Sequence, residues 1–482
     1  MSARLIATAA LAAVVLGACT VVGPDYERPK TTLPQTYAQT QPQAASASTG
    51  SVDTDWWKQF GDAQLSALVE TALANNTDIQ AAAARIEETD AILRETDAAF
   101  LPSVNLNAVG ARSQTSGFLV QGRPLLSNNL LLAVSSSYEI DFWGRLRRAS
   151  ESARAQTLAS RYAHDVVRLS IVGLSAQTWF ALRSLDEQIA LTRRTLATRE
   201  DALRIVGLRL DAGTASRLDL EQASGSRADA AILLRDLERQ RSLAESLLGR
   251  LSGQPGLRVP ASAGPDPLTT MPVPPQPPAG LPSELLARRP DVRQAEEQLV
   301  AANAQIGVAR AAMLPSISLT GAFGGQSIAL SDLLSDRARI WSLGFGLSLP
   351  IFDGGRLEAR SDQAVARDRQ ALAAYQGAAQ NAFREVSDAL IVAQAARDAE
   401  ADTRARAQAT ARSLQLSQMR YEAGYSAYLE VLDAQRSANA AELDVVRNRQ
   451  TRLNAAVDLF KALSGGWPDS QSGDAVPAAA SR

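Results

Sequence analysis

Few side chains in this sequence have the types and spacing that catalysis or metal binding requires. The 482 residues contain one histidine, His164, and one cysteine, Cys19. The sequence holds no plausible Ser/His/Asp set, no His-Glu-x-x-His motif, no phosphate-binding Gly-Lys-Ser/Thr loop and no cluster of metal ligands. His164 lies in a helical pattern, where an ordinary helix residue is the simpler interpretation. We therefore expect a protein that is not an enzyme, with no catalytic residue and no metal.

The only cysteine stands at the end of a predicted export signal at residues 1–18. Arg4 is followed by the apolar run Leu5 to Leu16 and then by small residues, as in a secretory signal peptide. Leu16-Gly17-Ala18-Cys19 matches a bacterial lipobox. We expect N-palmitoyl and S-diacylglycerol groups on Cys19, a covalent lipid being the only cofactor; a plain cleavage site is the alternative. By resemblance to other bacterial lipoproteins, Thr20 favours sorting to the outer membrane.

Two similar copies of one unit follow each other along the chain. Phe100-Leu101-Pro102-Ser103-Val104 returns 213 residues later as Met313-Leu314-Pro315-Ser316-Ile317, and Gly144-Arg145-Leu146 returns 211 residues later as Gly355-Arg356-Leu357. Repetition at a nearly fixed spacing indicates an internal tandem duplication. The predicted boundaries are an extended N-terminal segment with the lipid anchor at 19–61, a first repeat at 62–253, a proline-rich linker at 254–282, a second repeat at 283–466 and a disordered tail at 467–482.

Each copy contains two runs in which apolar and polar side chains alternate. In the first copy Val104, Leu106 and Ala108 alternate with Asn105 and Asn107, and a second run extends from Leu130 to Phe142. The second copy repeats the pattern around 316–323 and 341–349. A tilted membrane strand needs about 9–11 residues, whereas no segment beyond the signal approaches the ~20 residues of a membrane helix. Any membrane-spanning part is therefore expected to consist of strands; a soluble sheet with one wet face is the alternative.

A very long helix is predicted after each strand pair. Gly144 to Ala212 and Gly355 to Ala423 contain no proline, and at about 1.5 Å per residue each would reach on the order of 100 Å. Such lengths predict a coiled coil or a helical barrel. Both helices end at a glycine, Gly213 or Gly424, which can adopt the left-handed conformation that reverses the chain. The formal net charge of −2 gives no reason to expect nucleic acid as a partner.

Several short motifs occur in a characteristic order, although none is specific alone. They are Val22-Gly23-Pro24-Asp25-Tyr26-Glu27-Arg28-Pro29, Trp56-Trp57-Lys58-Gln59-Phe60, Arg289-Pro290-Asp291-Val292, Leu349-Pro350-Ile351-Phe352-Asp353-Gly354-Gly355 and Tyr421-Glu422-Ala423-Gly424. With them the chain, from Cys19 to Trp467, resembles the TolC-type outer-membrane efflux factors. The closest likeness is to the NodT-like lipoprotein branch, the outer-membrane components of resistance-nodulation-division efflux.

This resemblance implies a mixed α and β membrane protein in the outer membrane of a Gram-negative bacterium. Three protomers would give four strands each to one twelve-stranded β-barrel, continued by a long periplasmic α-helical barrel. A trimer is also expected on physical grounds, because four strands cannot close a barrel and open sheet edges are not tolerated in lipid. The implied function is a passive exit duct of a tripartite efflux system, connected through a periplasmic adaptor protein to an inner-membrane pump. The alternative is an outer-membrane lipoprotein scaffold, a coiled coil without channel activity.

The resemblance also implies a gate near the helical hairpins. A leucine, an aspartate and an arginine on the final helix correspond to Leu429, Asp433 and Arg436, whose spacing places them on one helix face. The simpler alternative is an exposed ion pair between Asp433 and Arg436. The first copy carries Gln222 and Gly225 at the positions equivalent to Asp433 and Arg436. We therefore expect only one hairpin of each protomer to carry the charged gate residues.

Two further sets of residues are expected to meet other molecules. The hairpin tips at Gly213, Thr214, Gly424 and Tyr425 would contact the adaptor, with a simple helix reversal as the alternative. The polar strand positions Asn105, Asn107, Glu139 and Asp141 would face the lumen and make the pore mildly tolerant of cations.

Overall fold

The computed structural model describes residues 21–30, 34, 54–116, 118, 125–261, 273 and 288–463, which fall into two compact units. The first unit comprises the segment 21–30 and the described residues of 84–161 and 294–377. The second comprises residue 34 and the described residues of 54–83, 162–293 and 378–463. The predicted signal peptide, Cys19, most of the linker and the predicted tail lie outside the described residues.

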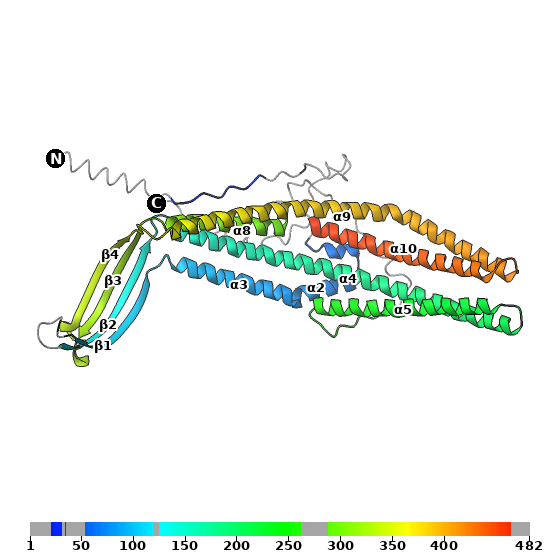
Figure 1. Ribbon diagram of the computed structural model, residues 1–482, viewed down its shortest axis with the longest axis horizontal. Helices are drawn as coiled ribbons and strands as arrows, with labels where there is room; N and C mark the ends of the chain where they lie inside the picture. Colours follow the sequence, from blue (N-terminus) through cyan, green and yellow to red (C-terminus); the bar gives the residue numbers. More distant parts are fainter. Residues whose placement is uncertain are drawn as a thin grey trace. The chain divides into compact units, whose positions relative to one another are not determined.

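The same order of helices and strands occurs twice along the chain (Figure 1). The first run comprises α3 (Thr77–Ala98), β1 (Ser103–Thr115), β2 (Leu125–Ile140), α4 (Arg145–Asp211) and α5 (Arg217–Leu251). The second comprises α8 (Pro290–Ala311), β3 (Ser316–Ser327), β4 (Arg339–Ser348), α9 (Arg356–Glu422) and α10 (Tyr428–Leu463). The short helices η2 (Trp56–Phe60) and α2 (Ala63–Asn75) precede the first run, and η3 (Leu330–Asp332) and η4 (Asp336–Ala338) connect β3 to β4. The expected long helices are confirmed, since α4 and α9 contain 67 residues each.

The two long helices begin with the same carboxylate cap. Asp141 accepts a hydrogen bond from the Leu146 backbone N–H at 2.9 Å, and Asp353 accepts one from the Leu357 N–H at 2.9 Å. The first N–H groups of a helix have no partner within the helix, and a negative charge there also suits the helix dipole. These two aspartates thus fix the points at which the chain turns from strand to helix.

The four strands form one antiparallel sheet in the order β1-β2-β3-β4 (Figure 1). The register places Leu106, Val134, Phe323 and Trp341 in one row across it, and three of these side chains are 60–75% exposed. The next row begins with Asn105 and lies on the opposite face, because successive side chains alternate. The predicted alternation is therefore confirmed, and it gives the sheet one apolar and one polar face.

The predicted end of the second strand was wrong by two residues. β2 ends at Ile140 rather than Phe142, and the Phe142 N–H bonds back to the Ile140 carbonyl at 2.8 Å in a tight turn. Asp141 consequently lies outside the strand. Of the helices in the described ranges, none combines the length and the apolar character that crossing a membrane requires.

Aromatic side chains form the largest core of the second unit. Trp56, Trp57 and Phe60 are at most 2% exposed, and Trp56 stacks on Phe460 of α10 with ring centres 5.5 Å apart and planes 6° apart. The Trp179 indole N–H donates to Asp62 at 2.7 Å, which joins α4 to the start of α2. The Trp56-Trp57 motif of the sequence therefore serves packing.

Candidate functional site

Both helical hairpins turn through the same backbone motif. Gly213 has φ 73° and Gly424 has φ 79°, in the left-handed region that favours glycine. The backbone N–H of the residue after each glycine donates back to a carbonyl in the last turn of the helix. Thr214 donates to the Arg209 carbonyl and Tyr425 to the Arg420 carbonyl, both at 2.8 Å. The glycines were predicted to end the helices in this way, and the structure confirms it.

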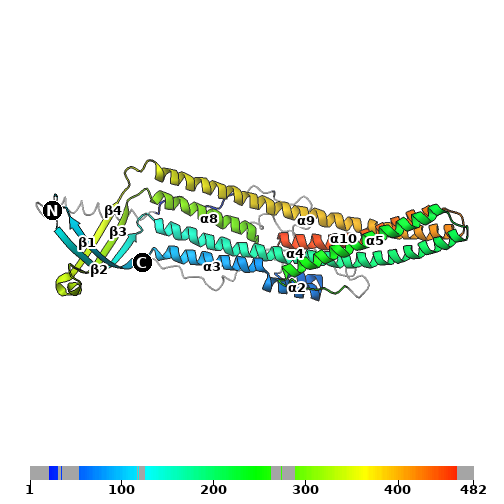
Figure 2. The same cartoon turned by 60° about the horizontal axis from the view of Figure 1, so that its bottom comes forward.

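The two hairpins pack together near their tips, within the second unit (Figure 2). Val206 of α4 and Ala223 of α5 form one buried cluster with Tyr428, Val431 and Leu432 of α10. These five side chains are at most 5% exposed. A shift of one hairpin against the other must therefore rearrange this tip cluster.

The predicted adaptor contacts lie on the surface of the tips. Gly213, Thr214, Gly424 and Tyr425 are exposed, Tyr425 at 80%. A Cβ atom added at either glycine would meet nothing within 4 Å. The tip surface is therefore open for contact with another molecule.

The three predicted gate residues share the exposed face of α10. Leu429 is 57% exposed, Asp433 is exposed, and the Arg436 side chain is 59% exposed. The opposite face, with Val431 and Leu432, is buried. The face shared by Leu429, Asp433 and Arg436 is thus the one left open by packing within this chain.

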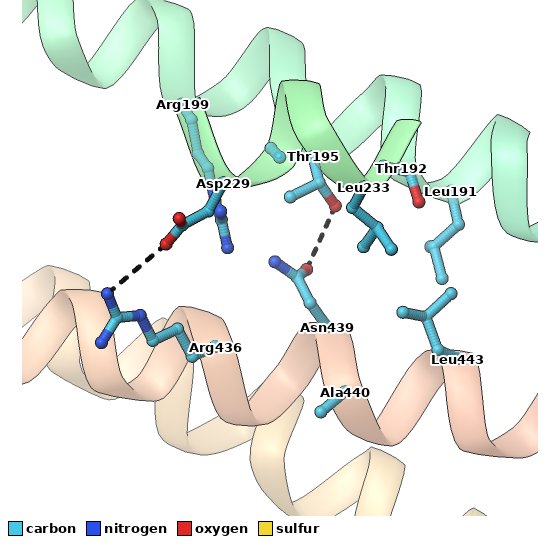
Figure 3. Close-up of a pocket in the computed structure, with 11 residues that line it drawn as sticks. Leu191, Thr192, Thr195, Arg199, Asp229, Leu233, Arg436, Asn439, Ala440 and Leu443 are labelled. Atoms are coloured by element: carbon cyan, nitrogen blue, oxygen red, sulfur yellow. Dashed lines mark hydrogen bonds and ion pairs between the residues drawn. The ribbon is translucent and has the colours of Figure 1, made fainter. Parts of the chain in front are cut away.

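Arg436 forms an ion pair with Asp229, a residue that no sequence motif indicated. Its Nη2 lies 3.8 Å from Oδ2 of Asp229 on α5, so the ion pair connects the two hairpins rather than residues of one helix (Figure 3). No ion pair joins Arg436 to Asp433 in the described part of the chain. The two partners are 207 positions apart, so no local spacing could have revealed the contact. Because both side chains are about 60% exposed, the pair is worth only about 0–1 kcal/mol.

The expected lumen-facing residues have partners of their own. The Asn107 amide donates to Ser135 on β2 at 2.7 Å. Glu139 accepts two bonds from the Arg145 guanidinium at 2.8 and 2.7 Å, and Asp141 caps α4. The hydrogen bond to Glu139 raises the pKa of Arg145. Arg145 thus offsets the charge of Glu139, and Arg147 offsets that of Asp141 at 3.1 Å.

A segment of the first unit, residues 21–30, lies along α4 and α8; we call it the strap. The Val22 N–H donates to the Trp143 carbonyl at 3.1 Å, and Asp25 accepts from Arg148 at 2.6 Å. Gly23 has φ 111°, and a Cβ there would lie 2.6 Å from the Gly307 Cα. In the motif Val22-Gly23-Pro24, the strap backbone therefore passes so close to the α8 backbone at Gly307 that only glycine fits at position 23.

The single histidine, His164, lies beside charged side chains of its own helix. His164 is a residue of α4 whose Nδ1 lies 3.7 Å from its neighbour Asp165. Burial, and then Arg168, lower the pKa of His164. Within the described ranges no group of three or more His, Cys, Asp or Glu residues has a geometry that could hold a metal ion.

Comparison with known proteins decides which family this architecture represents. The family model of the outer membrane efflux proteins matches residues 68–254 and again residues 281–465. The chain belongs to the outer membrane efflux protein family. The outer membrane protein OprJ of Pseudomonas aeruginosa is similar, with 38% identity over 472 residues and 96% of each chain covered. Crystal structures of CusC, whose subject is folding and transmembrane channel formation, superpose with a TM-score of 0.82 at 31% identity, covering 92% of this chain and 100% of the CusC chain.

The probable outer membrane lipoprotein SilC of Salmonella typhimurium is also similar. It is 33% identical over 461 residues, with 94% of this chain and 97% of SilC covered. As a member of the outer membrane efflux protein family, the chain is a transport protein of the outer membrane of a Gram-negative bacterium rather than an enzyme. The predicted family and location are confirmed.

Proposed function

We propose that this chain forms a homotrimeric exit duct of a tripartite efflux system. One observation carries the proposal: a four-stranded sheet that is apolar on one exposed face and polar on the other, and whose two edges are unpaired among the residues that the structure describes. Trp341, Leu343 and Leu347 of β4 are 63–81% exposed. Apolar surface of this extent needs a lipid or protein cover.

Three protomers would remove the open edges of the sheet. Pairing β1 of one protomer with β4 of the next would close a barrel of twelve strands, with the apolar face toward lipid and the polar face toward a lumen. The helices would continue this duct as a periplasmic α-helical barrel. The repeated element order supports a tandem duplication, in which each copy supplies two strands and one hairpin.

The particle mass and its conductance test this duct. In detergent we expect a mass of about three protomers plus lipid and detergent, each protomer being slightly lighter than the 51.2 kDa of the full sequence once residues 1–18 are removed. In a planar bilayer we expect ion-conducting channels. A stable monomer, or a trimer that conducts no ions in any variant, would contradict the proposal.

We place the gate of this duct at Leu429, Asp433 and Arg436. In a trimer the three Leu429 side chains would narrow the lumen, and the Arg436–Asp229 pairs would tie the two hairpins of each protomer together. A tie of about 0–1 kcal/mol per protomer is weak enough for an adaptor to break. Asp433→Ala combined with Arg436→Ala should raise single-channel conductance, and so should Asp229→Asn alone. Glu221→Gln is the matched control, because it removes the exposed pair of Glu221 with Arg217 on the same helix and should leave conductance unchanged.

The partners would be a periplasmic adaptor protein at the hairpin tips and an inner-membrane pump that supplies the energy. Thr214→Trp would place a large side chain on the open tip surface and should abolish efflux in cells while the trimer still assembles. Arg235→Trp, at an exposed position further along α5, should leave efflux intact. Equal loss in both variants would argue against the tips as the docking surface.

We also propose that Cys19 carries the covalent lipid. The SilC relative, named a probable lipoprotein, supports this proposal together with the lipobox. Cys19→Ser should remove the mass of the N-palmitoyl and S-diacylglycerol groups from the purified protein. An unchanged mass would reject lipidation.

A further inference from the structure

A cavity of about 240 Å³ lies between the two hairpins, next to the Arg436–Asp229 pair. It is lined by residues of α4, α5 and α10, all within the second unit (Figure 3). Since one water molecule takes up about 30 Å³ of liquid, the cavity has room for several waters or one small hydrated ligand. Leu191, Leu233 and Leu443 form one end of it, which limits the space to small molecules.

The polar part of the cavity is rich in hydrogen-bond donors. Arg199 is 8% exposed, and its Nη1 donates to the Ser226 carbonyl at 2.6 Å. Its Nε is buried and makes no hydrogen bond within the described chain. A buried donor left without a partner is destabilising, and more so when the group is charged.

Asn439 adds a further donor on the opposite wall. Its amide oxygen accepts a hydrogen bond from Thr195 at 3.2 Å. The amide nitrogen is turned toward Arg199 and Asp229 (Figure 3). An amide NH₂ group in this position can donate to a ligand but cannot neutralise charge.

The cavity carries more positive than negative charge. Arg199 and Arg436 line it together with a single carboxylate, Asp229, which leaves a formal charge of +1. Burial lowers the pKa of Arg199; Asp229 opposes this effect and Arg436 adds to it. An arginine nevertheless stays protonated in proteins, so the excess charge remains and an anion would balance it.

We propose that this cavity binds one small anion, an inorganic oxyanion or a small carboxylate, between Arg199, Arg436 and Asn439. Guanidinium groups bind such oxygens through paired, charge-assisted hydrogen bonds. The anion would compete with Asp229 for Arg436 and so loosen the tie between the hairpins. The binding site stands on the cavity alone, whereas this effect on opening rests on the proposed gate.

Calorimetric titration of the detergent-purified trimer tests the site. Sulfate and acetate are titrated separately, at constant ionic strength, with chloride as the background anion because it is neither an oxyanion nor a carboxylate. Saturable binding of sulfate assigns the site to oxyanions, and binding of acetate assigns it to carboxylates. If neither anion binds, the proposal is overturned.

Two substitutions with opposite expected effects separate binding from damage to the fold. Arg436→Gln should weaken binding at least tenfold, because it removes one of two cationic partners. Asp229→Asn should tighten binding at least tenfold, because it removes the competing carboxylate. Arg217→Gln, 81% exposed on α5, is the matched control and should change nothing. Weaker binding in Asp229→Asn, or equal loss in Arg217→Gln, would overturn the site.

Conductance with and without the binding anion then tests the link to the gate. At equal ionic strength we expect more frequent opening in sulfate than in chloride, and no such difference in Arg436→Gln. Binding without any change in opening would reject the link to gating and leave the anion site standing. Channels that open normally but bind no anion would reject the site and leave the proposed duct standing.

Discussion

The strap gives a prediction whose size follows from its contacts. Arg28 donates from Nε to Glu296 at 2.6 Å and from Nη2 at 2.5 Å, and the Tyr26 hydroxyl donates to the same carboxylate at 3.2 Å. The Glu296 side chain is 7% exposed, whereas that of Arg28 is 46% exposed. Arg28→Leu therefore removes a cationic partner of a buried carboxylate and should loosen the strap.

The expected cost is about 2 kcal/mol. Removing one partner of a buried ion pair costs about 3–5 kcal/mol, but the exposure of Arg28 lets water replace part of the interaction. The Tyr26 hydroxyl also remains. Replacing both partners, in Arg28→Leu with Glu296→Leu, should cost about 1 kcal/mol or less, because no buried charge is then left.

Hydrogen exchange at the Val22 amide reports this loosening, because that N–H bonds to the Trp143 carbonyl in the closed strap. A loss of about 2 kcal/mol should speed exchange about 30-fold in Arg28→Leu, and the double variant should restore most of the protection. Arg85→Leu removes an exposed pair of the same unit and should have no effect. Unchanged exchange in Arg28→Leu, or further loss in the double variant, would refute the reasoning.

Three further predictions concern the second unit. Because the folded-state pKa of His164 is lowered, folding stability should fall as the pH drops below about 6.5; in His164→Phe, urea unfolding should show less of this loss. Burial raises the pKa of Asp458 even though Gln177 donates to it, so Asp458→Asn should be more stable at neutral pH, and this gain should vanish below about pH 3.9. Trp56→Ala should lower the free energy of unfolding by about 3–5 kcal/mol through loss of the stack on Phe460, with Trp56→Phe much milder.

Local periodicity was enough to place the main helices and strands. The proline-free stretch from Gly144 predicted α4 to within one residue at each end, and the glycines at 213 and 424 marked both reversals. Asp141 was predicted to lie in the second strand because the alternating pattern of side chains continues past Ile140, the last residue of β2 that pairs with β3. Only the three-dimensional turn shows that its carboxylate caps a helix.

The contacts between distant segments required the tertiary structure. The spacing of Leu429, Asp433 and Arg436 placed them on one face of a helix, but it could not show that Arg436 meets Asp229 or that a cavity with Arg199 lies beside them. A sequence pattern records the period of one element, because neighbouring side chains share its geometry. Which faces of two separate helices meet depends on packing along their whole length, so the partner of Arg436 was decided by the fold.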